Sequence, residues 1–292
     1  MWDELNKKAV ELFQMGKYDE AMAAGKKALE ESEASFGPED PRVARSLNNL
    51  AEMYRARAQY DQAVPLWKRA LEIREKSLGK EHPDVATSLN NLGGAYFEQG
   101  RFDEAQPLFN RSLRILEKAL GPEHPDLVPC LNNLAALHRA SERYPAAKPL
   151  YERALAIEEK AFGPDHPEVG VCLNNMAGLY ELLGRYADAE PLYRRSLEIA
   201  EKAFGSDHPH VASTLGNLAG ILAQLERYDE AERLFHRAQK IIERTFGENH
   251  PFSVAGLDNL IEFYEGTGKH GEAEKLKDRV SEIRSSWTRD LH

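Results

Sequence analysis

A period of 42 residues runs through this chain. Proline recurs at that spacing, at Pro41, Pro83, Pro125, Pro167, Pro209 and Pro251. Glycine precedes each proline by four positions, at Gly37, Gly79, Gly121, Gly163, Gly205 and Gly247. Alanine keeps the same spacing at Ala21, Ala63, Ala105, Ala147, Ala189, Ala231 and Ala273. Such self-similarity predicts a stack of equivalent units in which each unit packs mainly on its neighbours.

Each unit has the pattern of two helices. In the unit from Pro83 to Gly121, the proline suits a first helical turn, where its missing N–H costs nothing. Apolar side chains then follow at helical spacing, first from Leu89 to Tyr96 and again from Ala105 to Leu116. We therefore predict an all-α fold, a right-handed superhelical solenoid (α-α superhelix) of seven helix-turn-helix repeats forming a single domain. The repeats are expected near residues 1–40, 41–82, 83–124, 125–166, 167–208, 209–250 and 251–292.

Small residues set how closely the two helices of a unit approach. Gly93 on the first helix and Ala105 on the second leave little side chain between them. A larger residue at Ala105 would overpack the contact, which typically costs about 1–3 kcal/mol.

Composition narrows the possible functions. The net charge of -10 disfavours binding to nucleic acid or to an anionic membrane surface. No stretch reaches the roughly 18 apolar residues of a membrane helix, and residues 1–10 do not resemble a secretory signal. The two cysteines, Cys130 and Cys172, occupy equivalent positions in adjacent repeats and are expected to be free thiols. We predict a cytoplasmic protein.

The residues that might support chemistry do not converge. Five of the ten histidines stand one per linker, before a repeat proline, where a helix-start role is expected: His82, His124, His166, His208 and His250. Side chains spaced one per repeat cannot meet on one metal ion. Phosphate-binding loops, nucleophile elbows and His-Glu-x-x-His helices are absent from the sequence. We predict no enzymatic activity, no metal and no cofactor.

The pattern L-x-N-L-[AG]-x-x-Y-x-x-x-G-x-[YF]-x-x-A, from Leu89 to Ala105, resembles the tetratricopeptide repeat. The 42-residue length, the Gly-x-x-His-Pro linker and the Leu-Asn-Asn-Leu signature resemble kinesin light chain repeats in particular. Kinesin light chains carry a long heptad coiled coil before their repeats, and nothing in this sequence resembles it. The resemblance therefore implies the groove-forming domain and does not imply a motor subunit.

The two asparagines of that signature point in different directions. At 100° per residue, Asn90, Gly94 and Phe97 lie nearly opposite the apolar face of their helix, and this side lines the concave surface in the resembled family. A row of carboxamides there could bind the backbone of an extended peptide. The candidates are Asn48, Asn90, Asn132 and Asn174. The second asparagine of each pair is expected to make a hydrogen bond between helices or repeats.

Selectivity for a ligand would come from other residues of this side. We predict that Arg45, Arg55, Arg139 and Phe97 contact a peptide with acidic and apolar residues, whereas Glu262 and Glu265 make the C-terminal end acidic. The alternative is that these arginines pair with neighbouring glutamates.

These features favour a protein-interaction scaffold or adaptor, a monomer that binds a protein or peptide in its groove. Two other readings stay open. The chain could be a structural array that self-associates, or a regulatory repeat segment of a larger signalling protein.

Overall fold

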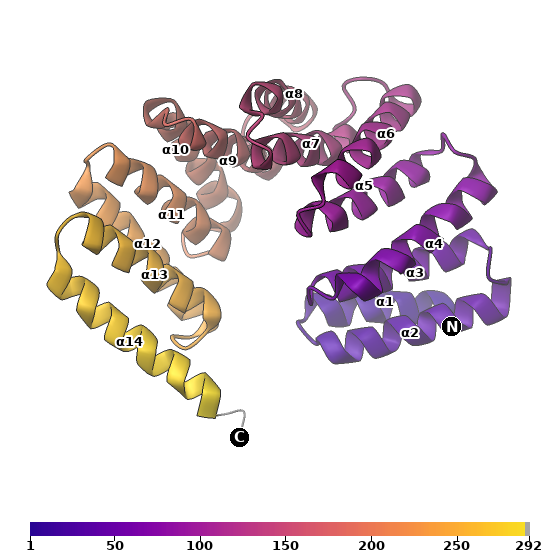
Figure 1. Cartoon of the computed structure of the whole chain (residues 1–292), viewed down its shortest axis with the longest axis horizontal. Helices are drawn as coiled ribbons and strands as arrows, with labels where there is room; N and C mark the ends of the chain where they lie inside the picture. Colours follow the sequence, from indigo (N-terminus) through magenta and orange to yellow (C-terminus); the bar gives the residue numbers. More distant parts are fainter. Residues whose placement is uncertain (290–292) are drawn as a thin grey trace. The chain divides into compact units, whose positions relative to one another are not determined.

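The computed structural model describes residues 1–289 and contains fourteen α-helices in seven consecutive pairs, with one short 3₁₀ turn and no strand among those residues (Figure 1). This confirms the predicted all-α class and the seven repeats. The first helices of the pairs are α1 (Trp2–Gln14), α3 (Pro41–Arg55), α5 (Pro83–Glu98), α7 (Val128–Ala140), α9 (Pro167–Leu182), α11 (Pro209–Gln224) and α13 (Pro251–Gly266). The second helices are α2 (Tyr18–Phe36), α4 (Tyr60–Leu78), α6 (Phe102–Leu120), α8 (Tyr144–Phe162), α10 (Tyr186–Phe204), α12 (Tyr228–Phe246) and α14 (His270–Arg289).

The linker histidines start the first helices, as predicted. His82 Nδ1 accepts a hydrogen bond of 3.1 Å from the backbone N–H of Asp84, and Pro83 occupies the first helical position. The same bond forms at His124, His166, His208 and His250, and Asp40 Oδ1 makes it in the first linker. Each linker therefore satisfies one of the backbone donors that a helix N-terminus leaves unpaired.

The fourth repeat starts differently from the others. Its first turn, η1 (Pro125–Leu127), is a 3₁₀ turn, and α7 begins only at Val128. Pro129 has no N–H and therefore cannot bond the carbonyl of Pro125 as an α-helix requires. A second proline four residues after the repeat proline is thus the reason for the altered turn.

Gly93 accommodates an aromatic ring. A methyl group on Gly93 would lie 2.7 Å from Phe109 Cε1, whereas one on the neighbouring Gly94 would meet nothing within 4 Å. Ala105 on α6 is fully buried in the same cluster. The small residues of the first helix thus make room for a large side chain of the second helix as well as for its backbone.

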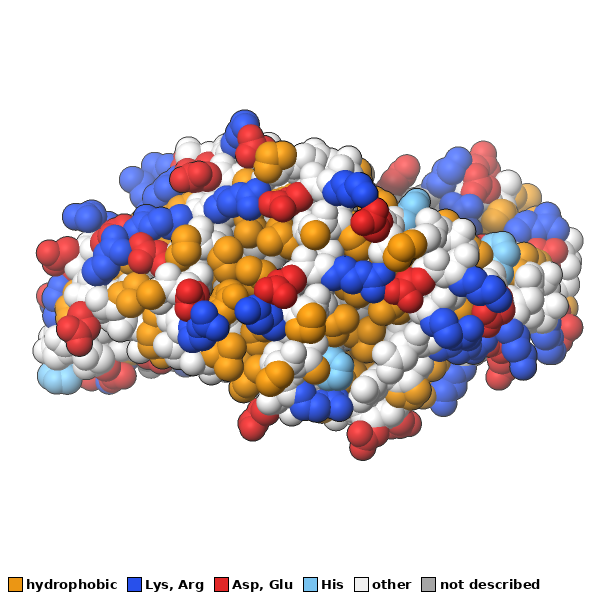
Figure 2. Space-filling model, turned by 90° about the horizontal axis from the view of Figure 1, so that it is seen from above, with side chains coloured by type: hydrophobic (Ala, Val, Ile, Leu, Met, Phe, Trp, Pro, Cys, Tyr) orange, Lys and Arg blue, Asp and Glu red, His pale blue; other side chains and the backbone are white. Residues whose placement is uncertain are grey.

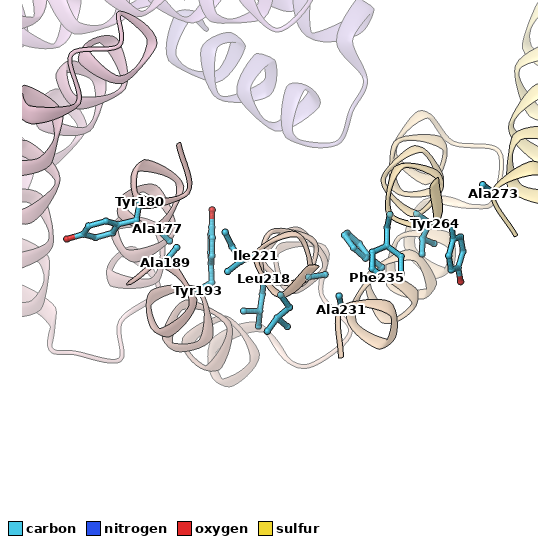
Figure 3. Close-up of a cluster of buried hydrophobic side chains, with 14 residues drawn as sticks. Ala177, Tyr180, Ala189, Tyr193, Leu218, Ile221, Ala231, Phe235, Tyr264 and Ala273 are labelled. Atoms are coloured by element: carbon cyan, nitrogen blue, oxygen red, sulfur yellow. The ribbon is translucent and has the colours of Figure 1, made fainter. Parts of the chain in front are cut away.

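By its internal contacts the chain divides into two compact units, Met1–Leu150 and Tyr151–His292. The first unit has a core of Trp67, Phe109, Leu92, Leu134 and neighbouring alanines. In the second unit, Tyr193 and Ile221 belong to one buried cluster with Phe235 and Tyr264, contributed by consecutive helices (Figure 3). Each core therefore runs from helix to helix along the stack of its own unit.

Charged side chains on the second helices are paired with one another. An arginine of one second helix meets a glutamate of the preceding one at 2.5 to 2.9 Å, in the pairs Arg69–Glu33, Arg111–Glu75, Arg195–Glu159, Arg237–Glu201 and Arg279–Glu243. Blue and red side chains lie next to each other over much of the face in Figure 2. Exposed pairs of this kind contribute about 0–1 kcal/mol each.

Within residues 1–289, every helix is too short or too polar to span a membrane.

Candidate functional site

The paired asparagines of the signature connect the first helices of adjacent repeats. Asn91 Nδ2 donates to Asn48 Oδ1 over 2.8 Å, and Asn133 Nδ2 donates to Asn90 Oδ1 over 3.0 Å. In the second unit Asn217 Nδ2 donates to Asn174 Oδ1, also over 3.0 Å. We call these bonds the asparagine ladder. Asn49, Asn91, Asn133 and Asn217 therefore make the predicted inter-repeat bond, with the first asparagine of the preceding repeat as acceptor, whereas Asn175 and Asn259 do not.

The first asparagines use their carbonyl oxygens within the protein. Asn48 Oδ1 also accepts from Trp67 Nε1 at 3.2 Å, and Asn90 Oδ1 also accepts from Cys130 Sγ at 3.2 Å. The amide nitrogens of Asn48, Asn90 and Asn174 have no acceptor within residues 1–289, and all three residues are only half-buried. An unpaired amide N–H₂ can donate to a ligand carbonyl, whereas the occupied oxygens are not available to accept.

Asn132 lies at the same register on α7 and is half-buried. Its Oδ1 is buried and has no hydrogen-bond partner among the described residues. Seven of the eight predicted site residues lie in the first unit, and Asn174 lies in the second. The structure thus places the candidates along several helices and does not bring them together at one point.

Two of the three predicted arginines are paired. Arg55 bonds Glu52 at 2.9 Å and Glu98 at 2.7 Å. Burial lowers the pKa of Arg55, but the two glutamate charges outweigh it and the pKa is raised overall. Arg45 lies 3.4 Å from Asp3, with its guanidinium 5.8 Å from the ring centre of Trp2. Arg45 and Arg55 therefore both follow the alternative prediction, in which the arginines pair with acidic neighbours.

Arg139 and Phe97 differ from that pair. Arg139 is half-buried on α7 and has no acidic partner within residues 1–289. Phe97 is half-buried, and its ring centre lies 5.6 Å from that of Phe102 at the start of α6. The Arg139 charge is therefore unpaired within the described residues, whereas part of the Phe97 ring is already covered.

The second unit contains a groove of about 900 Å³ bordered by α11, α12 and α13. Its position follows from a break in the asparagine ladder. Gly216 stands where the five earlier repeats carry the first asparagine, so Asn259 Nδ2 has no ladder acceptor and its side chain is exposed in the groove. Side chains added at Gly216 or Gly220 would meet nothing within 4 Å. Two glycines one helical turn apart therefore leave an open strip of α11 backbone along one wall.

The groove has an apolar floor and an acidic edge. Phe235, Phe246, Phe252 and Phe263 are among its lining residues, and Phe252 is 58% exposed. Glu181 and Glu262 also line it, and no lysine or arginine is among the lining residues in the described part of the chain. Volume and apolar lining are both typical of ligand sites.

Gln239 is a buried polar residue in this groove. It stands where five earlier repeats carry leucine, at Leu29, Leu71, Leu113, Leu155 and Leu197. Its Nε2 donates to Glu243 Oε1 at 2.7 Å and to the Ser253 carbonyl at 3.1 Å, but its Oε1 is buried without a partner. A methyl group on Gly256 would lie 2.1 Å from that oxygen. The oxygen thus occupies space that Ser, Cys or Thr fills at the register of Gly256 in the second to sixth repeats.

Chemical groups suited to catalysis are not assembled in the described residues. No group of three or more His, Cys, Asp or Glu side chains within residues 1–289 could hold a metal ion. Both cysteines are buried, and they form no disulfide bond within the described residues. Burial raises the pKa of the Cys130 thiol to about 11, against the lowering effect of its hydrogen bond to Ser112. A thiol with this pKa is a poor nucleophile at neutral pH.

Comparison with known families identifies the class of this protein. The sequence model of the tetratricopeptide repeat matches residues 5–76, 43–118, 84–159, 128–202, 173–226 and 210–286. The chain therefore belongs to the tetratricopeptide repeat family. Repeats of this family mediate protein–protein interactions and are generally not enzymes. A search of curated proteins finds no match.

Solved structures place it near kinesin light chain-like repeats. It is 28% identical to a crystal structure described as the nearly identical TPR-like repeats of a putative kinesin light chain from Podosopora anserina, with a TM-score of 0.60 over 70% of this chain and 97% of that one. BtubC (BKLC) from P. vanneervenii is 24% identical, with a TM-score of 0.64 over 80% and 91% of the two chains. The apo form of RapI is 16% identical over 99% of both chains, with a TM-score of 0.71. The last two similarities are evidence of a shared fold only.

The groove between α11 and α13 was not predicted from the sequence. The available signal was the coincidence of three departures from the repeat, at Gly216, Gln239 and Gly256. Each departure alone is unremarkable, and only the structure places the three around one hollow.

Proposed function

We propose that this chain is an interaction scaffold that binds an extended segment of a partner protein along the first helices of its repeats. The observation that supports this most directly is the set of unpaired amide nitrogens on Asn48, Asn90 and Asn174. Each can donate to a peptide carbonyl, and donors on consecutive helices of one unit, as at Asn48 and Asn90, suit the repeating backbone of an extended chain. Arg139, without an acidic partner in residues 1–289, would bind an acidic side chain of the same segment.

The second helices are less suited to this role. Their arginines and glutamates already bind one another in repeated pairs. A ligand there would have to replace existing ion pairs, whereas at the first helices it meets donors that are unpaired. This contrast favours the first-helix side for a partner, with Arg45, Arg55, Phe97 and Asn132 as flanking contacts.

The test is a peptide-display screen on the purified protein, followed by measurement of Kd for selected peptides with the variant Asn48→Asp/Asn90→Asp. Aspartate keeps the oxygen that accepts from Asn91 and Asn133, and replaces the free N–H₂ with a second oxygen. Since each lost hydrogen bond is worth about 0.5–1.5 kcal/mol, we expect binding to weaken roughly tenfold with little change in stability. Asn133→Ala is the matched control, because it removes a ladder bond and leaves the Asn90 donor in place. Binding unaffected by the double variant would contradict the proposal.

A self-associating array is the second candidate, and a dependence of molecular mass on concentration would favour it over the scaffold.

We propose that the protein is a monomer and acts in the cytoplasm. The burial of both free thiols is compatible with a reducing compartment.

A further inference from the structure

The groove between α11 and α13 has apolar surface that no other part of its unit covers. Phe246 and Phe252 are 38% and 58% exposed, and their ring centres lie 5.2 Å apart in an edge-on arrangement. Phe235 and Phe263 continue this surface inward, with ring centres 5.4 Å apart. Aromatic side chains arranged around a hollow gain from burying an apolar side chain of a ligand.

The charge at the edge of the groove is unpaired. Glu262 has no cationic partner within residues 1–289. Glu265, three residues later on the same helix, binds Lys277 at 2.8 Å. Since no lysine or arginine lines the groove in the described residues, Glu262 favours a positive charge on whatever enters.

Polar groups in the groove are also without partners. The Asn259 carboxamide projects where Gly216 has removed its ladder acceptor, and Gln239 Oε1 is a buried acceptor without a donor, on a side chain that is only 6% exposed. The Asn259 carboxamide is exposed and can bond the backbone of an extended segment, whereas the Gln239 oxygen lies against Gly256 and is covered by the protein.

We propose that this groove is a specificity subsite for a partner segment that carries an aromatic or leucine side chain next to a lysine or arginine. The apolar side chain lies on the phenylalanines, and its cationic neighbour lies at Glu262. The inference rests on the proposed function, since it assumes that the chain binds extended segments. It assigns to the last repeats a charge preference opposite to the acidic segment expected near Arg139.

The experiment uses the full chain and short peptides with one Trp or Leu flanked by Lys, Gln or Glu, with Kd measured by fluorescence anisotropy at low and high salt. We expect the Lys-flanked peptides to bind most tightly. Glu262→Gln should reduce the preference for Lys over Gln by about two- to fivefold, the range for a solvent-exposed ion pair. Glu265→Gln makes the same charge change outside the groove and should leave that preference unchanged. High salt should reduce the preference in the wild-type protein.

A second variant tests the groove itself. Gly216→Asn restores the residue of the five earlier repeats, which would give Asn259 a ladder acceptor and fill the open strip along α11. We expect it to weaken binding of the Lys-flanked peptide by roughly tenfold or more, as the apolar contact is lost. Thermal unfolding shows whether the Gly216→Asn variant folds. If it does not fold, the Glu262→Gln variant tests the subsite instead.

The outcomes separate this inference from the proposed function. Equal binding of Lys- and Glu-flanked peptides, equal effects of Glu262→Gln and Glu265→Gln, or unchanged binding to a folded Gly216→Asn variant would each overturn the subsite. If Asn48→Asp/Asn90→Asp loses binding and the groove variants have no effect, the proposed function is supported and the subsite is overturned. A chain that binds no peptide from any library would overturn both.

Discussion

Asn133 Nδ2 lies 3.0 Å from Asn90 Oδ1, and this bond joins the first helices of two consecutive repeats. The same bond between Asn91 and Asn48 is 2.8 Å long. The ladder joins neighbouring first helices, and at Asn48, Asn90 and Asn174 it uses the side-chain oxygen while the nitrogen has no acceptor within residues 1–289. The structural role and the proposed binding role thus belong to different atoms of one side chain.

The ladder bond should be measurable as stability. We expect Asn133→Ala to lower the free energy of unfolding by about 1 kcal/mol, because one inter-repeat hydrogen bond is lost. Asn259→Ala should have an effect near zero, since Gly216 has removed the acceptor at that register. Urea unfolding of the two variants provides the comparison. Equal losses in both would show that the bond does not contribute to stability.

Neighbouring glycines on α5 should respond in opposite ways to alanine. A methyl group at Gly93 would lie 2.7 Å from Phe109 Cε1, so Gly93→Ala should destabilise the chain by about 1–3 kcal/mol. Gly94 has open space around it, so Gly94→Ala should stabilise by about 0.5–1 kcal/mol through the higher helix propensity of alanine. Chemical denaturation of both variants tests this, and a destabilised Gly94→Ala would contradict the account of that face.

Gln239 and Gly256 should behave as a coupled pair. Gly256→Ser places a side chain where Gln239 Oε1 lies, which should cost about 1–3 kcal/mol. With Gln239→Leu also present, the site has the Leu and Ser of earlier repeats such as Leu71 and Ser88, and the cost of the serine should fall by about 1 kcal/mol or more. A double-mutant cycle measures this coupling, and additive effects would refute it.

The burial of Cys130 should affect how the stability of the chain and the reactivity of this thiol depend on pH. Its folded-state pKa is raised to about 11 from an ordinary value of 9.0, so the thiol's contribution to stability is fully present below pH 9.0 and is lost as pH rises toward about 11. In a Cys172→Ala variant, alkylation of native Cys130 should keep accelerating with pH beyond the point at which the urea-unfolded chain levels off. Coincident profiles for the native and unfolded chains would contradict this.

The repeats and the helix starts could be predicted because they depend on local residues at a fixed period. Pro83 and His82 sit side by side in the sequence, and the cap they form needs no distant partner. The second asparagine's structural bond also followed from its direction on the helix, and the structure confirms it.

The atoms at the candidate site could not be assigned in the same way. Which oxygen accepts the Asn133 amide depends on how two repeats pack, and the pairing of Arg55 with Glu98 joins residues 43 positions apart. The groove beside Gly216 could be predicted even less, because it depends on three departures from the repeat, one on each of three helices. Only the packing of those helices brings the three residues together. Periodicity predicts the residues that the repeats share, including the first asparagines, whereas the groove lies where individual repeats depart from the period.

The most direct test of the central claim is a titration of the ¹⁵N-labelled chain with a peptide selected by display, following the side-chain amide resonances of the asparagines by NMR. We expect the Nδ2 signals of Asn48, Asn90 and Asn174 to shift progressively to saturation, because those nitrogens gain a peptide carbonyl. The signals of Asn91 and Asn133, already bonded within the ladder, should move less. Saturation by a bound peptide that leaves the signals of Asn48, Asn90 and Asn174 unchanged would contradict the central claim.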